Sequence, residues 1–153
     1  MTDTEVSTWF DSFDTVMTDC DGVLWVGAEP ISGSPEMINR FRDLGKRVFF
    51  VTNNSTKHRR EYKTKLDKLG FGGTMVKRFT FYDGGKISNL IFLQDEIVGT
   101  AYLAATYLEQ INFDKSKLVY VVGSSGITQE LDDVGIKYLP IGVGVPIHAI
   151  YRI

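Results

Sequence analysis

The sequence predicts an α/β fold built on a parallel sheet. Two short apolar runs, 15–19 and 47–52, are rich in β-branched and aromatic residues and are typical of buried strands. Each run precedes a segment with helical spacing, over 34–44 and over 57–69. Strands that alternate with helices favour a parallel sheet, and ligands of such sheets bind outside the carboxyl ends of the strands.

The first strand is expected to end at Asp19, and a loop rich in glycine and proline follows it over 20–33. The first helix has clear signals at both ends. Ser34 is a suitable N-cap and Pro35 suits the first helical position. Gly45 can end the helix in a left-handed conformation.

The second strand, 47–52, is followed by a polar turn at Asn53-Asn54-Ser55-Thr56, which can also cap the helix 57–69. The segment 77–94 is less regular. It contains two β-prone runs around Asp83-Gly84-Gly85, which suggest a hairpin with poor alternation.

The remaining elements are a helix over 95–111 with one broad apolar face, a buried strand over 117–122 and a short helix over 127–134. The turn Gly123-Ser124-Ser125-Gly126 joins the last two. The final residues, 136–153, are apolar and rich in glycine and show no clear final element.

Composition limits the functional classes. The 153 residues are 43% hydrophobic and 24% charged, as in one ordinary globular domain. A net charge of −2 gives no basic surface for nucleic acid. No apolar run has the length of a membrane span, and the acidic N-terminus does not resemble a signal peptide. The single cysteine, Cys20, excludes a disulfide framework and fits a reducing compartment, so we expect a cytoplasmic protein.

Two carboxylates, Asp19 and Asp21, lie at the end of the first strand. Two like charges ~4 Å apart repel by about 4 kcal/mol at an effective dielectric constant near 20. A divalent cation such as Mg²⁺ would stabilise such a pair and leave coordination positions for a phosphate. Gly22 would allow the chain to turn away from the metal. The pair alone equally fits an acidic turn with no function.

The context of the pair resembles a known family. The segment D-C-D-G-V-L-W (19–25) is similar to the first motif of the haloacid dehalogenase superfamily of phosphohydrolases. The segment V-F-F-V-T-N-N-S (48–55) is similar to its second motif. Together they resemble the branch that contains 4-nitrophenyl phosphatases, phosphoglycolate phosphatases and pyridoxal phosphate phosphatases. The resemblance covers roughly 9–76 and 95–140.

The resemblance implies Mg²⁺-dependent hydrolysis of a small phosphorylated metabolite through an aspartyl-phosphate. Asp19 would be the nucleophile, and Asp21 the general acid and then the general base. Both would hold Mg²⁺, Asp21 through its backbone carbonyl. Thr52, Asn53 and Asn54 would bind phosphate oxygens, although Asn53-Asn54-Ser55 taken alone also fits plain turn and capping chemistry. The substrate classes implied are 2-phosphoglycolate, pyridoxal phosphate and 4-nitrophenyl phosphate.

The family architecture implies a partial Rossmann-like sheet with helices on both faces, plus part of an inserted α/β cap. In that frame, 1–76 is the N-terminal part of the core, 77–94 an unmatched insertion, 95–116 a helix linking core to cap, and 117–153 a partial cap with an unmatched tail. The family often forms homodimers through the cap, so we expect a homodimer and neither nucleic acid nor membrane as a partner.

Two later family motifs, a lysine and a strand ending in Gly-Asp-x-x-x-x-Asp, are not found in the sequence. A competing hypothesis is therefore a truncated, catalytically impaired isoform that acts as a binding or dimerisation partner. A third is a receiver-type or flavodoxin-like domain, against which the two motifs argue.

Three further features are expected to have no chemical role. Cys20 is expected to be a small packed residue. His58 is expected in solvent on a helix, and Asp132-Asp133 on a solvated surface. Neither histidine has a cysteine or histidine partner at metal-binding spacing, so zinc is not expected.

Overall fold

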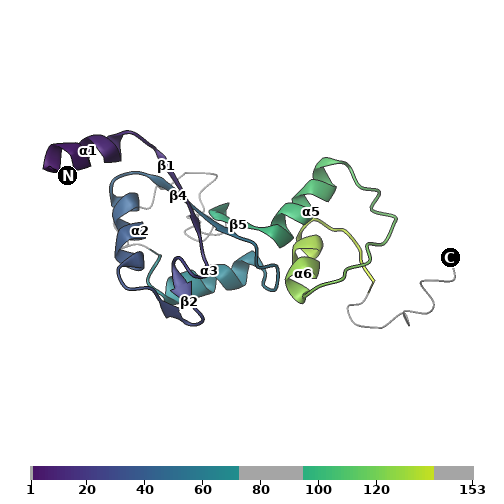
Figure 1. Ribbon diagram of the computed structural model, residues 1–153. Helices are drawn as coiled ribbons and strands as arrows, with labels where there is room; N and C mark the ends of the chain where they lie inside the picture. Colours follow the sequence, from purple (N-terminus) through teal and green to yellow (C-terminus); the bar gives the residue numbers. More distant parts are fainter. Residues whose placement is uncertain (1, 73–94, 140–153) are drawn as a thin grey trace, which may run out of the picture. The chain divides into compact units, whose positions relative to one another are not determined.

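The computed structural model describes residues 2–72 and 95–139 (Figure 1). The chain divides into two compact units. The first unit comprises Met1–Asn53 and Arg59–Thr100, and the second comprises Asn54–His58 and Ala101–Ile153. The expected hairpin within 77–94 lies outside the described residues, as does the tail from 140 onward.

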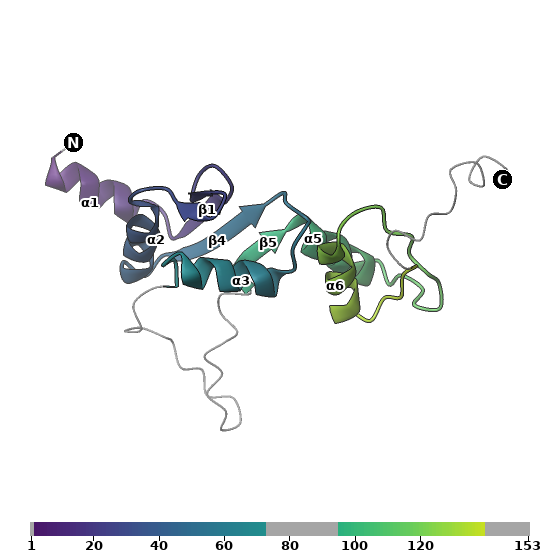
Figure 2. The ribbon, with the colours of Figure 1, turned by 90° about the horizontal axis from the view of Figure 1, so that it is seen from below.

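The first unit contains a parallel sheet of three strands, β1 (Thr15–Asp19), β4 (Arg47–Thr52) and β5 (Ile97–Gly99), in the order β1-β4-β5 (Figure 2). Asp19 pairs with Val51, and Thr52 pairs with Gly99. The carboxyl ends of all three strands therefore meet at one edge of the sheet. The predicted α/β class with a parallel sheet is confirmed.

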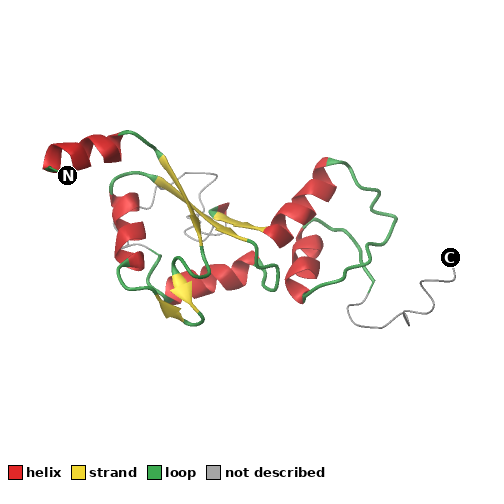
Figure 3. Cartoon of the chain, in the orientation of Figure 1, coloured by secondary structure: helices red, strands yellow, loops and turns green. Residues whose placement is uncertain are grey.

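Helices α2 (Ser34–Asp43) and α3 (Arg59–Lys68) contact β4 and β5, respectively (Figure 3). Gly33 is the N-cap of α2, with φ +82°, so the cap lies one residue before the Ser34 that was predicted. Each helix buries a short apolar face, with Ile38 on α2 and Tyr62 and Leu66 on α3.

A two-stranded hairpin, β2 (Trp25–Val26) and β3 (Glu29–Pro30), lies within the predicted loop 20–33. It brings Trp25 into the core, where the indole is fully buried. Phe71 contacts the rings of both Trp25 and Phe50 edge to face, at 5.9 and 6.4 Å between centroids. This aromatic cluster anchors the loop that follows the acidic pair.

The second unit contains α6 (Ser125–Asp133) and, from Ala101 onward, α5 (Thr100–Gln110). Its small core consists of Ala105, Val121, Leu131 and Ile136. The expected buried strand 117–122 is wrong, because only an isolated bridge between Val119 and Tyr138 forms there. Alternate residues of this segment, Leu118, Tyr120 and Val122, are exposed.

The predicted helix 95–111 is also wrong in its first turn. Ile97–Gly99 form β5, because Ile97 and Val98 pair with β4 and their β-branched side chains favour a sheet. Ile111, the last residue of the predicted helix, is 52% exposed.

One further helix was not predicted, α1 (Asp3–Asp11). Thr2 and Glu5 form a capping box at its start, in which each side chain bonds the backbone N–H of the other residue. Trp9 is half-exposed, and its ring packs against those of Phe10 and Phe13. Among the described residues, no helix has the length and apolar character needed to span a membrane.

Candidate active site at the carboxyl end of the first strand

The two predicted catalytic carboxylates lie where β1 ends. Asp19 is the last residue of the strand, and both Asp19 and Asp21 are exposed. Asp19 Oδ1 accepts a hydrogen bond from the Cys20 backbone N–H at 2.7 Å. Asp21 Oδ1 accepts one from the Trp25 indole N–H, also at 2.7 Å. Each carboxylate is therefore held by one oxygen while the residue faces solvent.

The turn after β1 holds the two acids in place. Gly22 has φ +85°, a conformation that L side chains rarely adopt, and its N–H donates to the Trp25 carbonyl at 2.8 Å. The Leu24 N–H donates back to the Cys20 carbonyl at 2.9 Å. The turn is thus fixed to the hairpin that carries Trp25.

Cys20, between the two acids, points into the core and is 1% exposed. The pKa of its thiol is raised to about 12, chiefly by burial and in smaller part by the neighbouring charges of Asp19 and Asp21. The thiol is therefore protonated at neutral pH and is not a nucleophile. This confirms the expectation of a packed cysteine.

Sequence reasoning missed Trp25 as the residue that orients Asp21. Its ring is also covered by Lys65, whose Nζ lies 4.2 Å from the ring centroid and donates to the Gly27 carbonyl at 2.9 Å. Lys65 is also close enough to Cys20 for its charge to lower the pKa of that thiol. The D-x-x-x-W spacing from Asp21 to Trp25 was the only signal in the sequence.

Thr52 ends β4, on the strand that neighbours β1. It is 2% exposed and shares a side-chain hydrogen bond with Tyr62. Burial raises the pKa of Tyr62, while the bond with Thr52 opposes that rise. The predicted phosphate-binding hydroxyl is thus placed at the correct sheet edge, in a buried position beside a tyrosine.

The two asparagines that follow Thr52 differ in their surroundings. Asn53 is exposed, and its carbonyl accepts from the Thr100 hydroxyl at 3.1 Å. Asn54 Oδ1 accepts from the Thr56 N–H at 3.0 Å and from its hydroxyl at 2.6 Å. Asn54 therefore performs the turn chemistry that was the alternative to phosphate binding.

The structure brings four of the predicted site residues to one edge of the sheet: Asp19, Asp21, Thr52 and Asn53. The fifth, Asn54, belongs to the second unit.

The donor set at this edge fits Mg²⁺. Exposed carboxylates and backbone carbonyls are the hard oxygen ligands that Mg²⁺ takes in proteins, usually one or two together with water and phosphate. Asp19 supplies an exposed carboxylate, and Asp21 a backbone carbonyl in the same turn.

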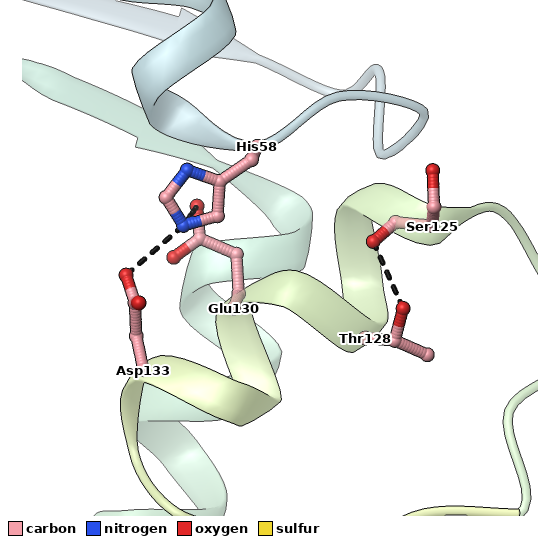
Figure 4. Close-up of polar contacts among 5 residues, drawn as sticks. All are labelled: His58, Ser125, Thr128, Glu130 and Asp133. Atoms are coloured by element: carbon pink, nitrogen blue, oxygen red, sulfur yellow. Dashed lines mark hydrogen bonds and ion pairs between the residues drawn. The ribbon is translucent and has the colours of Figure 1, made fainter.

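A second group of titratable side chains corrects one expectation and confirms another. His58, expected in solvent, is 3% exposed. Its Nε2 lies 3.0 Å from Asp133 Oδ2 and 3.6 Å from Glu130 Oε1 (Figure 4). Asp132 and Asp133 are both exposed, as expected for a solvated surface, and Asp132 accepts from the Tyr138 hydroxyl at 3.0 Å. Sequence reasoning missed these contacts because 75 residues separate His58 from Asp133.

The chain is similar to curated phosphatases. It is 41% identical over 129 residues to the chloroplastic phosphoglycolate phosphatase 1A of Arabidopsis thaliana, covering 84% of this chain and 30% of that protein. It is also 41% identical over 133 residues to glycerol-3-phosphate phosphatase of Rattus norvegicus, covering 86% and 37%. The chain thus spans about a third of the length of these relatives.

Solved structures agree with this similarity. The p-nitrophenyl phosphatase of Archaeoglobus fulgidus superposes with a TM-score of 0.63 at 25% identity, covering 82% of this chain and 40% of that one. A glycerol phosphate phosphatase of Mycobacterium tuberculosis in complex with magnesium has the same fold, with a TM-score of 0.62 at 24% identity, covering 85% and 33%. A model of haloacid dehalogenase-like hydrolases matches residues 16–137. The chain therefore belongs to the haloacid dehalogenase-like hydrolase family.

Proposed function

We propose that this chain carries the nucleophile and the acid–base residue of a Mg²⁺-dependent phosphomonoester hydrolase. The observation that carries the proposal is the pair of exposed carboxylates, Asp19 and Asp21, at the carboxyl end of β1 beside Thr52. This arrangement supplies a carboxylate nucleophile and a second carboxylate for proton transfer, two of the groups that phosphoryl transfer to an enzyme carboxylate uses.

In this proposal Asp19 attacks the phosphorus atom of the substrate and forms an aspartyl-phosphate. Asp21 protonates the leaving alkoxide, and then accepts a proton from the water that hydrolyses the intermediate. The indole N–H of Trp25 orients the Asp21 carboxyl for both steps. Thr52 and Asn53 bind phosphate oxygens from the end of β4.

The Asp19 carboxylate and the Asp21 carbonyl would hold Mg²⁺. When bound, the ion supplies positive charge that offsets the repulsion between the phosphate and the carboxylates. In this proposal the phosphate binds at the carboxyl edge of the sheet, where Asp19 and Thr52 end neighbouring strands.

We propose a small phosphorylated metabolite as the substrate. Relatives are named for phosphoglycolate, glycerol 3-phosphate and 4-nitrophenyl phosphate, all small phosphomonoesters. 2-Phosphoglycolate, pyridoxal phosphate and 4-nitrophenyl phosphate are the substrate classes that the resemblance implies, and the named relatives add glycerol 3-phosphate.

We propose the cytoplasm as the compartment of this protein, and fluorescence microscopy of a tagged chain tests it.

The test is hydrolysis of 4-nitrophenyl phosphate by the purified chain, with and without Mg²⁺. We expect turnover that requires Mg²⁺ and falls on the order of 10³-fold or more in Asp19→Asn. The matched control is Asp14→Asn, the same change in an exposed residue just before β1. A folded chain whose turnover equals that of Asp19→Asn would contradict the proposal.

A second candidate function, dimerisation with another copy of the chain, is favoured by a different observation. The second unit exposes several large apolar side chains, among them Leu103, Tyr107 and Ile111 at helical spacing from α5 onward. We expect a dimer in sedimentation equilibrium that Leu103→Lys and Tyr107→Lys convert to a monomer. The exposed Met17 of β1 provides a control as Met17→Lys, and a monomeric parent chain would contradict this candidate.

A further inference from the structure

Three ligand-type side chains form a compact group in the second unit, which we call the His58 cluster: His58, Glu130 and Asp133. Their nearest ligand atoms, one imidazole nitrogen and two carboxylate oxygens, all lie within 4.8 Å of one another. His58 and Glu130 are buried, at 3% and 1% exposure, and the Asp133 side chain is 26% exposed. Figure 4 shows the three side chains converging on one point.

The local fold explains why these residues converge. Glu130 and Asp133 are three residues apart on α6, so they share one face of the helix. Gly126, in the first turn of α6, lies against the segment that carries His58. A Cβ atom at Gly126 would lie 2.5 Å from the Ser55 carbonyl oxygen and 2.6 Å from the Lys57 nitrogen. This close approach fixes His58 against the acidic face of the helix.

We propose that the His58 cluster binds a divalent transition-metal ion of the Zn²⁺ class. Zn²⁺ takes imidazole nitrogen and carboxylate oxygen as ligands at about 2.0–2.2 Å. Two such ligands on one ion, at tetrahedral or octahedral angles, lie about 2.8–3.6 Å apart. The separations of His58 Nε2 from the two carboxylates, 3.0 and 3.6 Å, lie within that interval, and all three ligand atoms lie within 4.8 Å of one another.

The ligand types distinguish this site from the one at Asp19. Imidazole favours zinc and neighbouring first-row metals, whereas an all-oxygen set favours Mg²⁺. The ion would take the place of the contact between His58 Nε2 and Asp133 Oδ2, because a ligating imidazole nitrogen carries no proton.

The hydroxyl of Thr128, also on α6, is not directed at the cluster. The Thr128 hydroxyl donates to the Ser125 carbonyl at 3.0 Å, within α6 (Figure 4). The cluster thus offers three protein ligands, and the partly exposed side of Asp133 leaves room for a water as a fourth. Such an ion would fasten the segment after Asn53 to α6, and this inference does not depend on the proposed phosphatase activity.

The test measures metal binding rather than catalysis. The full chain, stripped with a chelator, is titrated with Zn²⁺ by calorimetry and with Co²⁺ by visible absorption. Both are repeated in Asp19→Asn, which removes the carboxylate of the other proposed site. We expect one Zn²⁺ per chain in both proteins, and at least about tenfold weaker binding in Asp133→Asn and in His58→Gln.

Two variants serve as matched controls. Asp132→Asn changes the neighbouring carboxylate, which bonds Tyr138 rather than His58. His148→Gln removes the only other histidine in the sequence. Both are expected to bind Zn²⁺ as the parent chain does. Because Asp133 is partly exposed, its variant decides the result even where His58→Gln fails to fold.

Two outcomes would overturn the proposal. The first is the absence of saturable Zn²⁺ binding by the folded parent chain, which would leave the cluster as a buried ion pair only. The second is binding that Asp133→Asn leaves unchanged, or that Asp132→Asn weakens equally.

Discussion

The bond between Trp25 and Asp21 gives the first prediction at the scale of single residues. Trp25→Phe keeps an aromatic ring in the core but removes the N–H that holds the Asp21 carboxylate at 2.7 Å. A hydrogen bond to a charged group contributes about 1.5–3 kcal/mol, so loss of orientation at the acid–base residue should lower kcat by roughly tenfold or more. Steady-state hydrolysis of 4-nitrophenyl phosphate measures this.

The control for Trp25→Phe is Trp9→Phe, at the only other tryptophan of the chain, which is half-exposed on α1. It should leave kcat unchanged. Equal kcat in folded Trp25→Phe and the parent would show that the indole has a packing role alone.

Cys20 gives a prediction about pH. Its pKa is raised from 9.0 to about 12, so the folded state favours the neutral thiol. The stabilising contribution of the thiol is complete below pH 9 and is lost as pH rises from 9 toward 12, since the unfolded chain loses the proton first. The free energy of unfolding, measured by urea titration, should therefore fall over this interval less steeply in Cys20→Ala than in the parent.

Reactivity offers an independent check of the same thiol. At pH 8 the native chain should react slowly with a thiol reagent, and the urea-unfolded chain quickly, because the thiolate is the reactive form. As Cys20 is the sole cysteine, the signal has one source. Fast labelling of the native chain would contradict the buried position.

At the scale of elements, the approach of α6 to the segment 54–58 predicts the effect of Gly126→Ala. The added methyl group would lie 2.5–2.7 Å from backbone atoms of Ser55 and Lys57, which cannot move as a flexible side chain can. Overpacking of this kind costs typically 1–3 kcal/mol, and exceeds the roughly 1 kcal/mol that alanine gains over glycine in a helix. Thermal unfolding should show a lower Tm.

Ser125→Ala, at the exposed neighbouring position of α6, adds no atom and serves as the control. An increase of Tm in Gly126→Ala would mean that helix propensity outweighs the close contact.

The elements that sequence reasoning predicted are those with local signals. The structure contains the predicted strands at 15–19 and 47–52 and the predicted helix that begins near Pro35. Apolar runs and capping residues identify such elements from a few neighbouring positions in the sequence. The error at 97–99 has a tertiary cause, since Ile97 and Val98 continue the apolar pattern of the following helix and become a strand only through pairing with β4. The missed α1 had a local signal, the Thr2–Glu5 capping box.

At the scale of the whole molecule, the candidate site was predictable in part. The motifs placed Asp19, Asp21, Thr52 and Asn53 at one sheet edge, because parallel strands align their carboxyl ends. The pairing of Trp25 with Asp21 had the D-x-x-x-W spacing as its signal. The hydrogen bond between Thr52 and Tyr62 and the His58 cluster depend instead on packing between elements. No short-range pattern in the sequence encodes those contacts.

Arg42 makes the long-range contacts that give the last prediction. On α2, its guanidinium bonds Glu96 at 2.6 Å and the Phe71 carbonyl, and it lies 5.4 Å from the centroid of the Phe50 ring. It thus joins three segments of the first unit that are distant in sequence. Burial raises the pKa of Glu96, and the charge and hydrogen bond of Arg42 oppose that rise.

Arg42→Ala would leave Glu96 half-buried without this cation and remove the donor to Phe71. Breaking a buried pair at one partner costs about 3–5 kcal/mol, and since both side chains here retain some exposure we expect about 2–4 kcal/mol. Urea unfolding followed by tryptophan fluorescence measures the loss, because Trp25 lies in the same core. Arg40→Ala, exposed on the same helix, should change the free energy of unfolding by less than about 0.5 kcal/mol. Equal effects of the two substitutions would show that the Arg42 contacts do not hold these segments together.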